Sequence, residues 1–161
     1  MVFPNPPKTW LAGEKPTAAT LNAEIRDAFK AIGDPWTAYS PSWTTSGTAP
    51  SLGNGSLTGA YRQTGKFVTF RIRLLAGSTT TFGTGEFRFT YPATAINSFI
   101  PGLSGYIFRS GPSYFGIIGV GFATTSLRLI TSSGNALVTA TSPLTFTNGD
   151  ELNIGGTYEA A

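Results

Sequence analysis

The side chains that could carry out chemistry are few, and their types limit what that chemistry can be. Histidine and cysteine are both absent, which removes the usual general base, the commonest zinc ligands and every disulfide. The second part of the chain holds four carboxylates: Glu86, Asp150, Glu151 and Glu159. A glycosidase needs two carboxylates that flank one cleft, whereas adjacent strand residues point to opposite faces. We therefore expect no enzymatic activity, no metal and no cofactor, and we interpret Asp150 as a turn residue.

Three arginines are the candidates for binding chemistry. Arg71, Arg73 and Arg88 alternate with apolar residues, so all three are expected on faces opposite the aromatic core. Such a row usually forms a solvated face that prevents edge-to-edge aggregation. The alternative is contact with an anionic partner, such as a teichoic-acid-like polymer or an acidic capsid surface. The net charge of +3 is too small and too dispersed to predict nucleic-acid binding.

The sequence also raises the possibilities of dinucleotide binding and sugar binding, but neither can be assigned to particular residues. The glycine-rich stretch at 53–59 superficially resembles a dinucleotide loop, but its last glycine is one position late and no strand–turn–helix context surrounds it. Exposed aromatic side chains could stack on sugar rings. Because the core needs so many aromatic residues, no single Trp or Tyr is assigned that role.

The strand that positions two of the arginines is the clearest element of the sequence. Lys66 to Leu75 reads KFVTFRIRLL, with apolar residues at every second position and polar residues between them. This period of two predicts a strand with one buried face. The preceding GAYRQTGK supplies a partner strand and a tight turn at Thr64-Gly65, which predicts a hairpin.

Residues 36–161 are predicted to form a β-domain around this hairpin. Turn signals rich in Gly and Asn separate short apolar-polar repeats. The predicted strands are Trp36–Thr44, Ser56–Gln63, Lys66–Ala76, Gly85–Tyr91, Leu103–Arg109, Tyr114–Phe122, Ser126–Thr131, Ala136–Thr141 and Glu151–Tyr158. Eight or nine short strands spaced in this way, together with 20 Gly and an aromatic content of 13%, predict an antiparallel β-sandwich with a jelly-roll-like form.

Residues 1–35 have a different composition and no strand pattern. Three prolines within Met1–Trp10 favour an extended arm, with Phe3 and Trp10 as anchors on a partner surface. A short α-helix should follow, begun by the N-cap Thr17 and ended by Gly33 and Pro35. We assign this segment to attachment and oligomerisation.

The predicted helix has a narrow apolar seam, formed by Leu21, Ile25, Ala28 and Ile32, with Phe29 beside it. A helix of about fifteen residues is marginal alone in water, so the seam should pack against something. The helix could lie on its own β-domain, or it could form a short bundle between subunits. The sequence leaves both possibilities open.

Nothing in the sequence predicts a membrane protein or a secreted one. The first residues, MVFPNPPKTW, lack the basic start and apolar core of a signal peptide. The long uncharged stretches at 89–108 and 129–149 are interrupted by Gly, Pro, Ser, Thr and Asn, so they are interpreted as buried strands and turns. We expect a soluble protein that can fold in a bacterial cytoplasm.

Two stretches resemble virion proteins of tailed bacteriophages. TWLAGEKPTAATLNAEIRDAF is similar to the start of many such proteins, at Trp10, Gly13, Glu14, Thr17, Ala18, Leu21 and Asn22. The stretch YSPSWTTSGTAPSLGNGSLTGAYRQTGKFVTFRIRLLAGSTTTFGTGEFRFTYP and the later NGDELNIGGTYEAA resemble the β-rich domain of minor tail, fibre and head-fibre proteins, especially those of actinobacterial phages. The resemblance carries no catalytic motif.

The resemblance implies a structural protein on the virion exterior, made in the host bacterial cytoplasm. It implies a homotrimer with a jelly-roll-like knob, joined to other virion proteins of the capsid or tail. The short chain favours a capsid decoration or head fibre attached by its N-terminal arm. The alternative is a tail-associated host-recognition module that binds cell-wall glycan through the knob, and a glycan hydrolase is the least favoured class.

Overall fold

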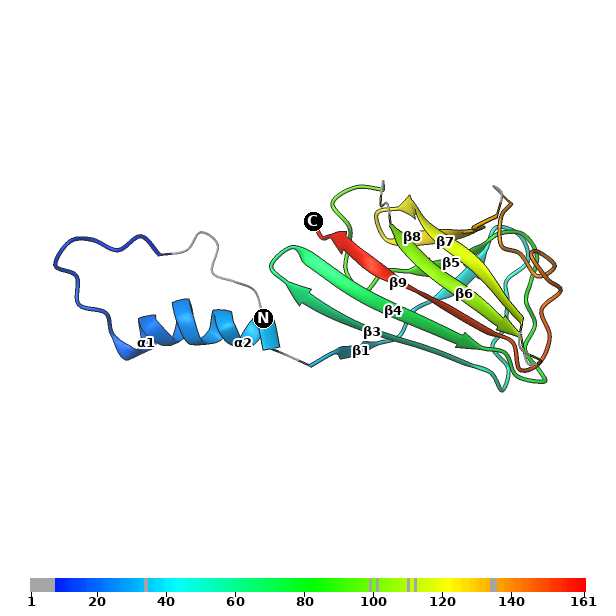
Figure 1. Cartoon of the computed structure of the whole chain (residues 1–161), viewed down its shortest axis with the longest axis horizontal. Helices are drawn as coiled ribbons and strands as arrows, with labels where there is room; N and C mark the ends of the chain where they lie inside the picture. Colours follow the sequence, from blue (N-terminus) through cyan, green and yellow to red (C-terminus); the bar gives the residue numbers. More distant parts are fainter. Residues whose placement is uncertain are drawn as a thin grey trace.

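The computed structural model describes residues 8–33, 35–98, 100, 102–109, 111, 113–133 and 136–161, apart from the side chains of Ala28, Ala31 and Ile32. The chain is mostly β-structure, preceded by one short helical segment (Figure 1). We call the sheet and the loops that pack on it, residues 37–161, the β-domain. All of its strand pairs are antiparallel, as the sequence predicts.

The strands of the described chain belong to a single curled sheet. Its order is β1-β3-β4-β9-β6-β7-β8-β5-β2. The bounds are β1 Thr37–Tyr39, β2 Trp43–Thr45, β3 Ser56–Thr64, β4 Phe67–Leu75, β5 Phe87–Thr90, β6 Leu103–Arg109, β7 Ser113–Ala123, β8 Ser126–Thr131 and β9 Glu151–Glu159. The sheet forms a half-barrel, consistent with a β-sandwich-like fold, so the predicted fold class is confirmed.

The predicted hairpin is formed by β3 and β4, which follow the edge strand β1 in the sheet order. β3 and β4 pair along their whole length around a turn in which Gly65 has a φ of +60°, a conformation that favours glycine. Val68, Phe70, Ile72 and Leu74 are almost completely buried, while the residues between them face outward. The alternation of this strand is therefore confirmed residue by residue.

The core fills the inside of the curl with large apolar side chains from both ends of the sheet order. Trp43 of β2 packs edge-on against Phe87 and stacks on Phe89, both from β5. On the other side, Phe70 packs edge-on against Tyr91 and Tyr158. Because every strand sends its apolar face inward, the polar residues of β4 and β5 face away from each other.

The two edge strands, β1 and β2, are neighbours in sequence and lie at opposite ends of the sheet order. Residues 40–42 cross from one edge to the other, and the Tyr39 hydroxyl donates a 3.5 Å hydrogen bond to the carbonyl of Thr90 in β5. The single predicted strand Trp36–Thr44 is therefore wrong. Buried Pro41, which has no N–H to donate, lies in the crossing.

The predicted strand Ala136–Thr141 is also wrong, because the described part of this segment makes only isolated bridges. The backbone of Val138 is nevertheless fully paired. Its N–H donates to Leu129 at 2.9 Å, and its carbonyl accepts from Phe87 N–H at 2.9 Å. A completely buried valine thus belongs to a loop that pairs with Leu129 of β8 and Phe87 of β5, next to the residues where these two strands pair directly.

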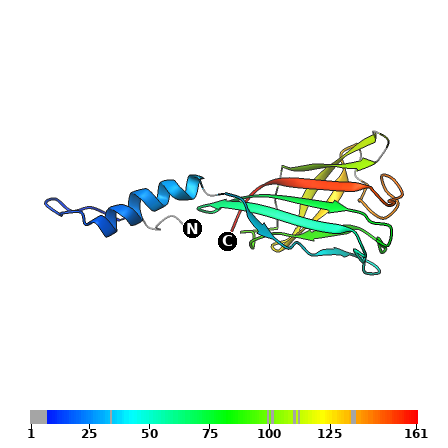
Figure 2. The ribbon, with the colours of Figure 1, turned by 90° about the horizontal axis from the view of Figure 1, so that it is seen from below.

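The helical segment begins at the predicted cap and stands away from the β-domain (Figures 1 and 2). It consists of α1 Ala18–Leu21, a π-helical turn η1 Asn22–Arg26 and α2 Asp27–Gly33. Thr17 Oγ1 accepts a 3.2 Å hydrogen bond from Thr20 N–H, as expected of an N-cap. The sequence did not predict the π-helical turn, since no Gly or Pro lies within it.

Candidate functional site

The helix presents an apolar stripe, which we define as Leu21, Ile25 and Phe29. The exposed fractions of these side chains are 39%, 50% and 70%. None of the helical side chains that the structure describes is buried, although the sequence left open that the helix could lie on its own β-domain. The described residues of the stripe therefore do not pack on the β-domain, whereas the side chains of Ala28 and Ile32 lie outside the described residues. In the described chain the stripe faces solvent.

The arm turns back along the helix. The N–H of Leu11 donates to a Glu14 carboxylate oxygen at 3.2 Å, and Gly13 adopts a φ of +82°. Lys8 forms a 2.5 Å ion pair with Glu14, and its N–H donates to the Glu24 carboxylate at 3.2 Å. The described arm therefore lies beside the helix that follows it.

The structure describes only some of the residues predicted to attach the chain or to form the oligomer. Trp10 is exposed, with the Lys8 ammonium 5.2 Å from the centre of its ring. Phe3 lies outside the described residues, as do the side chains of Ala28 and Ile32. Their roles in attachment remain predictions.

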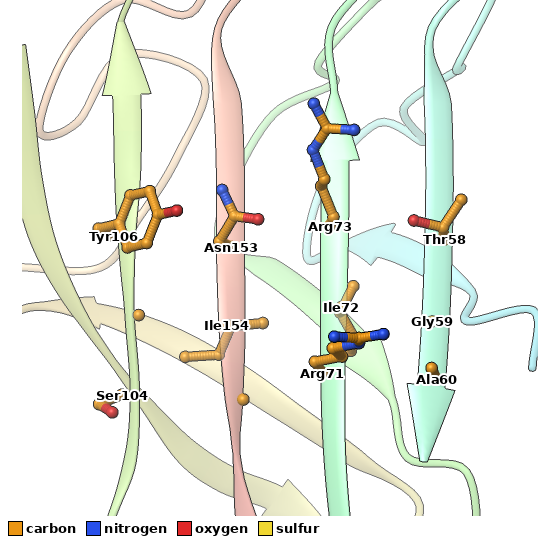
Figure 3. A pocket seen from close by; sticks show the side chains of 12 residues that line it. Thr58, Gly59, Ala60, Arg71, Ile72, Arg73, Ser104, Tyr106, Asn153 and Ile154 are labelled. Carbon is orange, nitrogen blue, oxygen red and sulfur yellow. The ribbon is translucent and has the colours of Figure 1, made fainter. Parts of the chain in front are cut away.

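A groove crosses the outward face of four neighbouring strands, β3, β4, β9 and β6 (Figure 3). Its volume is about 780 Å³. The register places outward residues in two parallel rows, Ala60–Arg71–Gly155–Ser104 and Thr58–Arg73–Asn153–Tyr106. Two of the three predicted arginines therefore lie together, from one strand, within a single groove.

The groove is low in the middle because the side chains there are small. Gly155 has no side chain and Ser104 has a short one, whereas Arg71 on β4 and Tyr106 on β6 have long side chains. Packing between β9 and β4 fixes this floor, because a Cβ on Gly155 would lie 2.7 Å from the Phe70 carbonyl oxygen. The depression is thus a consequence of how these two strands pack.

The two groove arginines have different electrostatic environments. The Arg73 guanidinium donates two hydrogen bonds of 2.8 and 2.6 Å to the Glu151 carboxylate. This contact lowers the pKa of the Glu151 carboxyl. Arg71 lies over the Trp36 ring, with its guanidinium carbon 4.9 Å from the ring centre. Among the described residues no carboxylate forms an ion pair with Arg71. Its charge is available to a ligand.

One side of the groove continues into an aromatic cluster, which we define as the exposed Tyr106 and Tyr114 and the half-buried Phe108. Tyr106 and Tyr114 are 44% and 66% exposed, and their rings meet edge to face at 5.7 Å. Phe108 lies 5.1 Å from Tyr114. These rings come from the outward faces of β6 and β7, so the core does not account for them.

Arg88 lies apart from the other two predicted arginines. It belongs to β5, which is five places from β4 in the sheet order. Its guanidinium pairs with Glu86, lies 3.8 Å from the centre of the Phe122 ring, and neighbours Arg128, which is 3.7 Å from the same carboxylate. The three arginines therefore do not form one continuous face.

Three of the four carboxylates considered for catalysis take part in ion pairs: Glu86, Asp150 and Glu151. Glu86 is 6% exposed and lies between two arginines. Asp150 is 2% exposed, accepts a 2.7 Å hydrogen bond from Thr147 N–H and pairs with Arg109 at 2.9 Å. Burial alone would raise the pKa of Asp150, but the hydrogen bonds from Arg109 and Thr147 outweigh burial and hold that pKa below its usual value. The predicted turn role of Asp150 is confirmed.

The described residues include neither a metal-binding cluster of side chains nor a membrane-spanning helix. They contain no group of three or more acidic side chains placed to hold a metal ion. No helix among them has the length and apolar character needed to cross a lipid bilayer.

Sequence reasoning missed most of the groove, namely Thr58, Ala60, Ser104, Tyr106, Asn153 and Gly155. These residues meet only through the pairing of β9 between β4 and β6, which local patterns do not reveal. One signal was present: Ser104, Tyr106 and Phe108 alternate with Leu103 and Ile107, which placed two aromatic side chains on the outward face.

The fold and these surfaces define a mostly β protein with an exposed apolar stripe on its helix and a groove on the outward face of its sheet. Comparisons with protein-family models, with curated proteins and with solved structures found no match. The function therefore has to be argued from the chain itself.

Proposed function

We propose that the protein is a structural component of a bacteriophage virion, attached by its N-terminal arm and helix and displaying the β-domain on the particle exterior. The observation that carries the proposal is the uncovered apolar stripe of Leu21, Ile25 and Phe29. A helix of this length gains most of its stability from packing, and here its own β-domain supplies none to the stripe. The resemblance to phage virion proteins supplies the biological setting, a capsid decoration or head fibre.

The partners follow from the same stripe. Three copies could bury the stripe against one another in a short bundle, which leaves three β-domains projecting on one side. The trimeric order comes from the family resemblance, because the seam is too short to specify it. The arm, with exposed Trp10, would then contact capsid or tail proteins.

Deletion of residues 1–33 tests this division of roles. The remaining β-domain contains all the residues that form the buried apolar core, so it should stay β-rich and unfold cooperatively. It should no longer join particles, and Trp10→Ala in the full chain should weaken incorporation with little effect on unfolding. Immunogold labelling would show where on the particle the full chain lies. Normal incorporation of the deleted protein would place attachment in the β-domain and overturn the proposal.

A second candidate function is favoured by the groove and the aromatic cluster beside it. Exposed aromatic rings next to hydroxyl, amide and guanidinium groups are the side chains that bind sugars and anions. A tail-associated module that recognises host cell-wall glycan would use such a surface. Labelling at the tail, together with glycan binding by the isolated β-domain, would favour this candidate over a capsid decoration.

A further inference from the structure

We propose that the groove across β3, β4, β9 and β6 binds an acidic oligosaccharide, with Arg71 as the residue that pairs with its anionic group. The inference deepens the second candidate function and rests on it, because it names a site and a ligand class for glycan recognition. It does not depend on how the protein attaches to a particle.

The charge of the groove selects an anion. Arg71 and Arg73 line it, and no acidic residue does. Arg73 is neutralised by Glu151, which pairs with it through both carboxylate oxygens. Arg71 is held over Trp36 and has no carboxylate partner in the described chain, so one positive charge stays fixed and available. A planar guanidinium can donate two parallel hydrogen bonds to a carboxylate or a phosphate.

The other lining groups suit a sugar better than a peptide or a nucleic acid. Thr58, Ser104 and Asn153 offer short hydroxyl and amide groups, and Tyr106 offers a ring and a hydroxyl. β4, β9 and β6 each pair with a neighbouring strand on both sides, so a peptide cannot add as another strand between them. One available cation is too few for a polyanion, whose binding requires several.

The dimensions suit a short oligosaccharide. Adjacent strands are about 4.8 Å apart and alternate outward residues about 6.8 Å apart, so the Cα atoms of Arg71 and Tyr106 are roughly 12 Å apart. Gly155 lies on β9, the strand between them, and Ser104 lies beside Tyr106 on β6. A ligand that spans this distance can pair its anionic group with Arg71 and place a ring against Tyr106, which a single small anion cannot do.

Binding should be measured by calorimetry on the full-length protein with three probes. An oligogalacturonide carries carboxylates, a phosphomannan fragment carries phosphate, and maltotriose is neutral. We expect at least one acidic probe to bind and maltotriose to bind at least roughly tenfold more weakly, since one charge-assisted hydrogen bond is worth about that factor. Binding of only one acidic probe identifies the anion. Equal binding of all three, or of none, overturns the inference.

Two pairs of variants locate the site. Arg71→Gln should weaken acidic binding by roughly tenfold or more. Lys66→Gln, which removes the same charge about 17 Å away along the hairpin, should leave it unchanged. Tyr106→Ala should weaken binding of every probe that binds, whereas Tyr114→Ala, outside the groove, should have a smaller effect. Equal losses for Arg71→Gln and Lys66→Gln would indicate non-specific charge attraction and contradict the inference.

Two controls keep the result independent of folding and of the virion proposal. Amide resonances of Ser104 and Gly155 should shift on titration with the acidic probe, and shifts confined to other strands would contradict the site. Arg71→Gln should retain the unfolding midpoint and should still incorporate into particles. Loss of binding with normal incorporation supports the groove, whereas failed incorporation of the wild-type chain argues only against the virion role.

Discussion

The apolar stripe should hold the proposed trimer together, and a double substitution can test this directly. Ile25 and Phe29 are 50% and 70% exposed. Full burial of a large apolar side chain contributes about 1.5–3 kcal/mol, so covering the exposed parts is worth about 1 and about 1.5 kcal/mol per protomer. Three protomers together lose about 7 kcal/mol when both side chains are removed, which is about five powers of ten in the association constant.

Ile25→Asp with Phe29→Asp should therefore convert the assembly to monomers at micromolar concentration. Light scattering should give a wild-type mass of three times 16.9 kDa and a variant mass of 16.9 kDa. The control is Ala23→Asp, which adds a carboxylate at an exposed position two residues from both Leu21 and Ile25. Because that position lies about 200° around the helix from the stripe, this variant should stay trimeric. A wild-type monomer at every concentration, or a trimeric double variant, would refute the reasoning.

Three further predictions concern the β-domain. Ile72→Ala should destabilise the protein by about 2–5 kcal/mol in urea unfolding, because Ile72 is buried in the core. Glu86→Gln should cost about 1–3 kcal/mol by leaving Arg88 without its carboxylate, and unchanged stability would contradict a structural role for the pair. The lowered pKa of Asp150 stabilises the fold above its unfolded-state pKa of about 3.9, and this contribution is lost as the pH falls through the lower folded-state pKa. Asp150→Asn should therefore flatten the acid limb of the stability–pH curve, and a limb as steep as wild type would contradict the assignment.

Local patterns predicted the strands that have one buried and one exposed face. β4 is correct because its alternation extends over the whole strand, and the Thr17 cap is correct because it depends only on neighbouring residues. Ala136–Thr141 was predicted as a strand from similar residue types. Its backbone pairs with Leu129 and Phe87 in a loop instead, and this tertiary context is not encoded within the segment.

The candidate site was predictable only in part. Periodicity correctly put Arg71, Arg73 and Arg88 on outward faces. It could not show which strands lie side by side and therefore which outward side chains are neighbours. That depends on strand order, which places β4 beside β9 and β5 beside β2 and β8. The helix stripe was recognisable from spacing, whereas the exposure of Leu21, Ile25 and Phe29 in the described chain could be seen only in the structure.

The position of β9 determines when the β-domain can form during synthesis. β9 pairs with β4 on one side and with β6 on the other, although it lies more than forty residues after β6 in the sequence. Until Glu151–Glu159 leave the ribosome, β4 and β6 each expose one unpaired edge at the centre of the future sheet. Nascent chains should therefore depend on chaperones or rapid synthesis, and a premature stop before β9 should yield an aggregating product rather than a smaller folded one. Only chains that include β9 would be available for assembly.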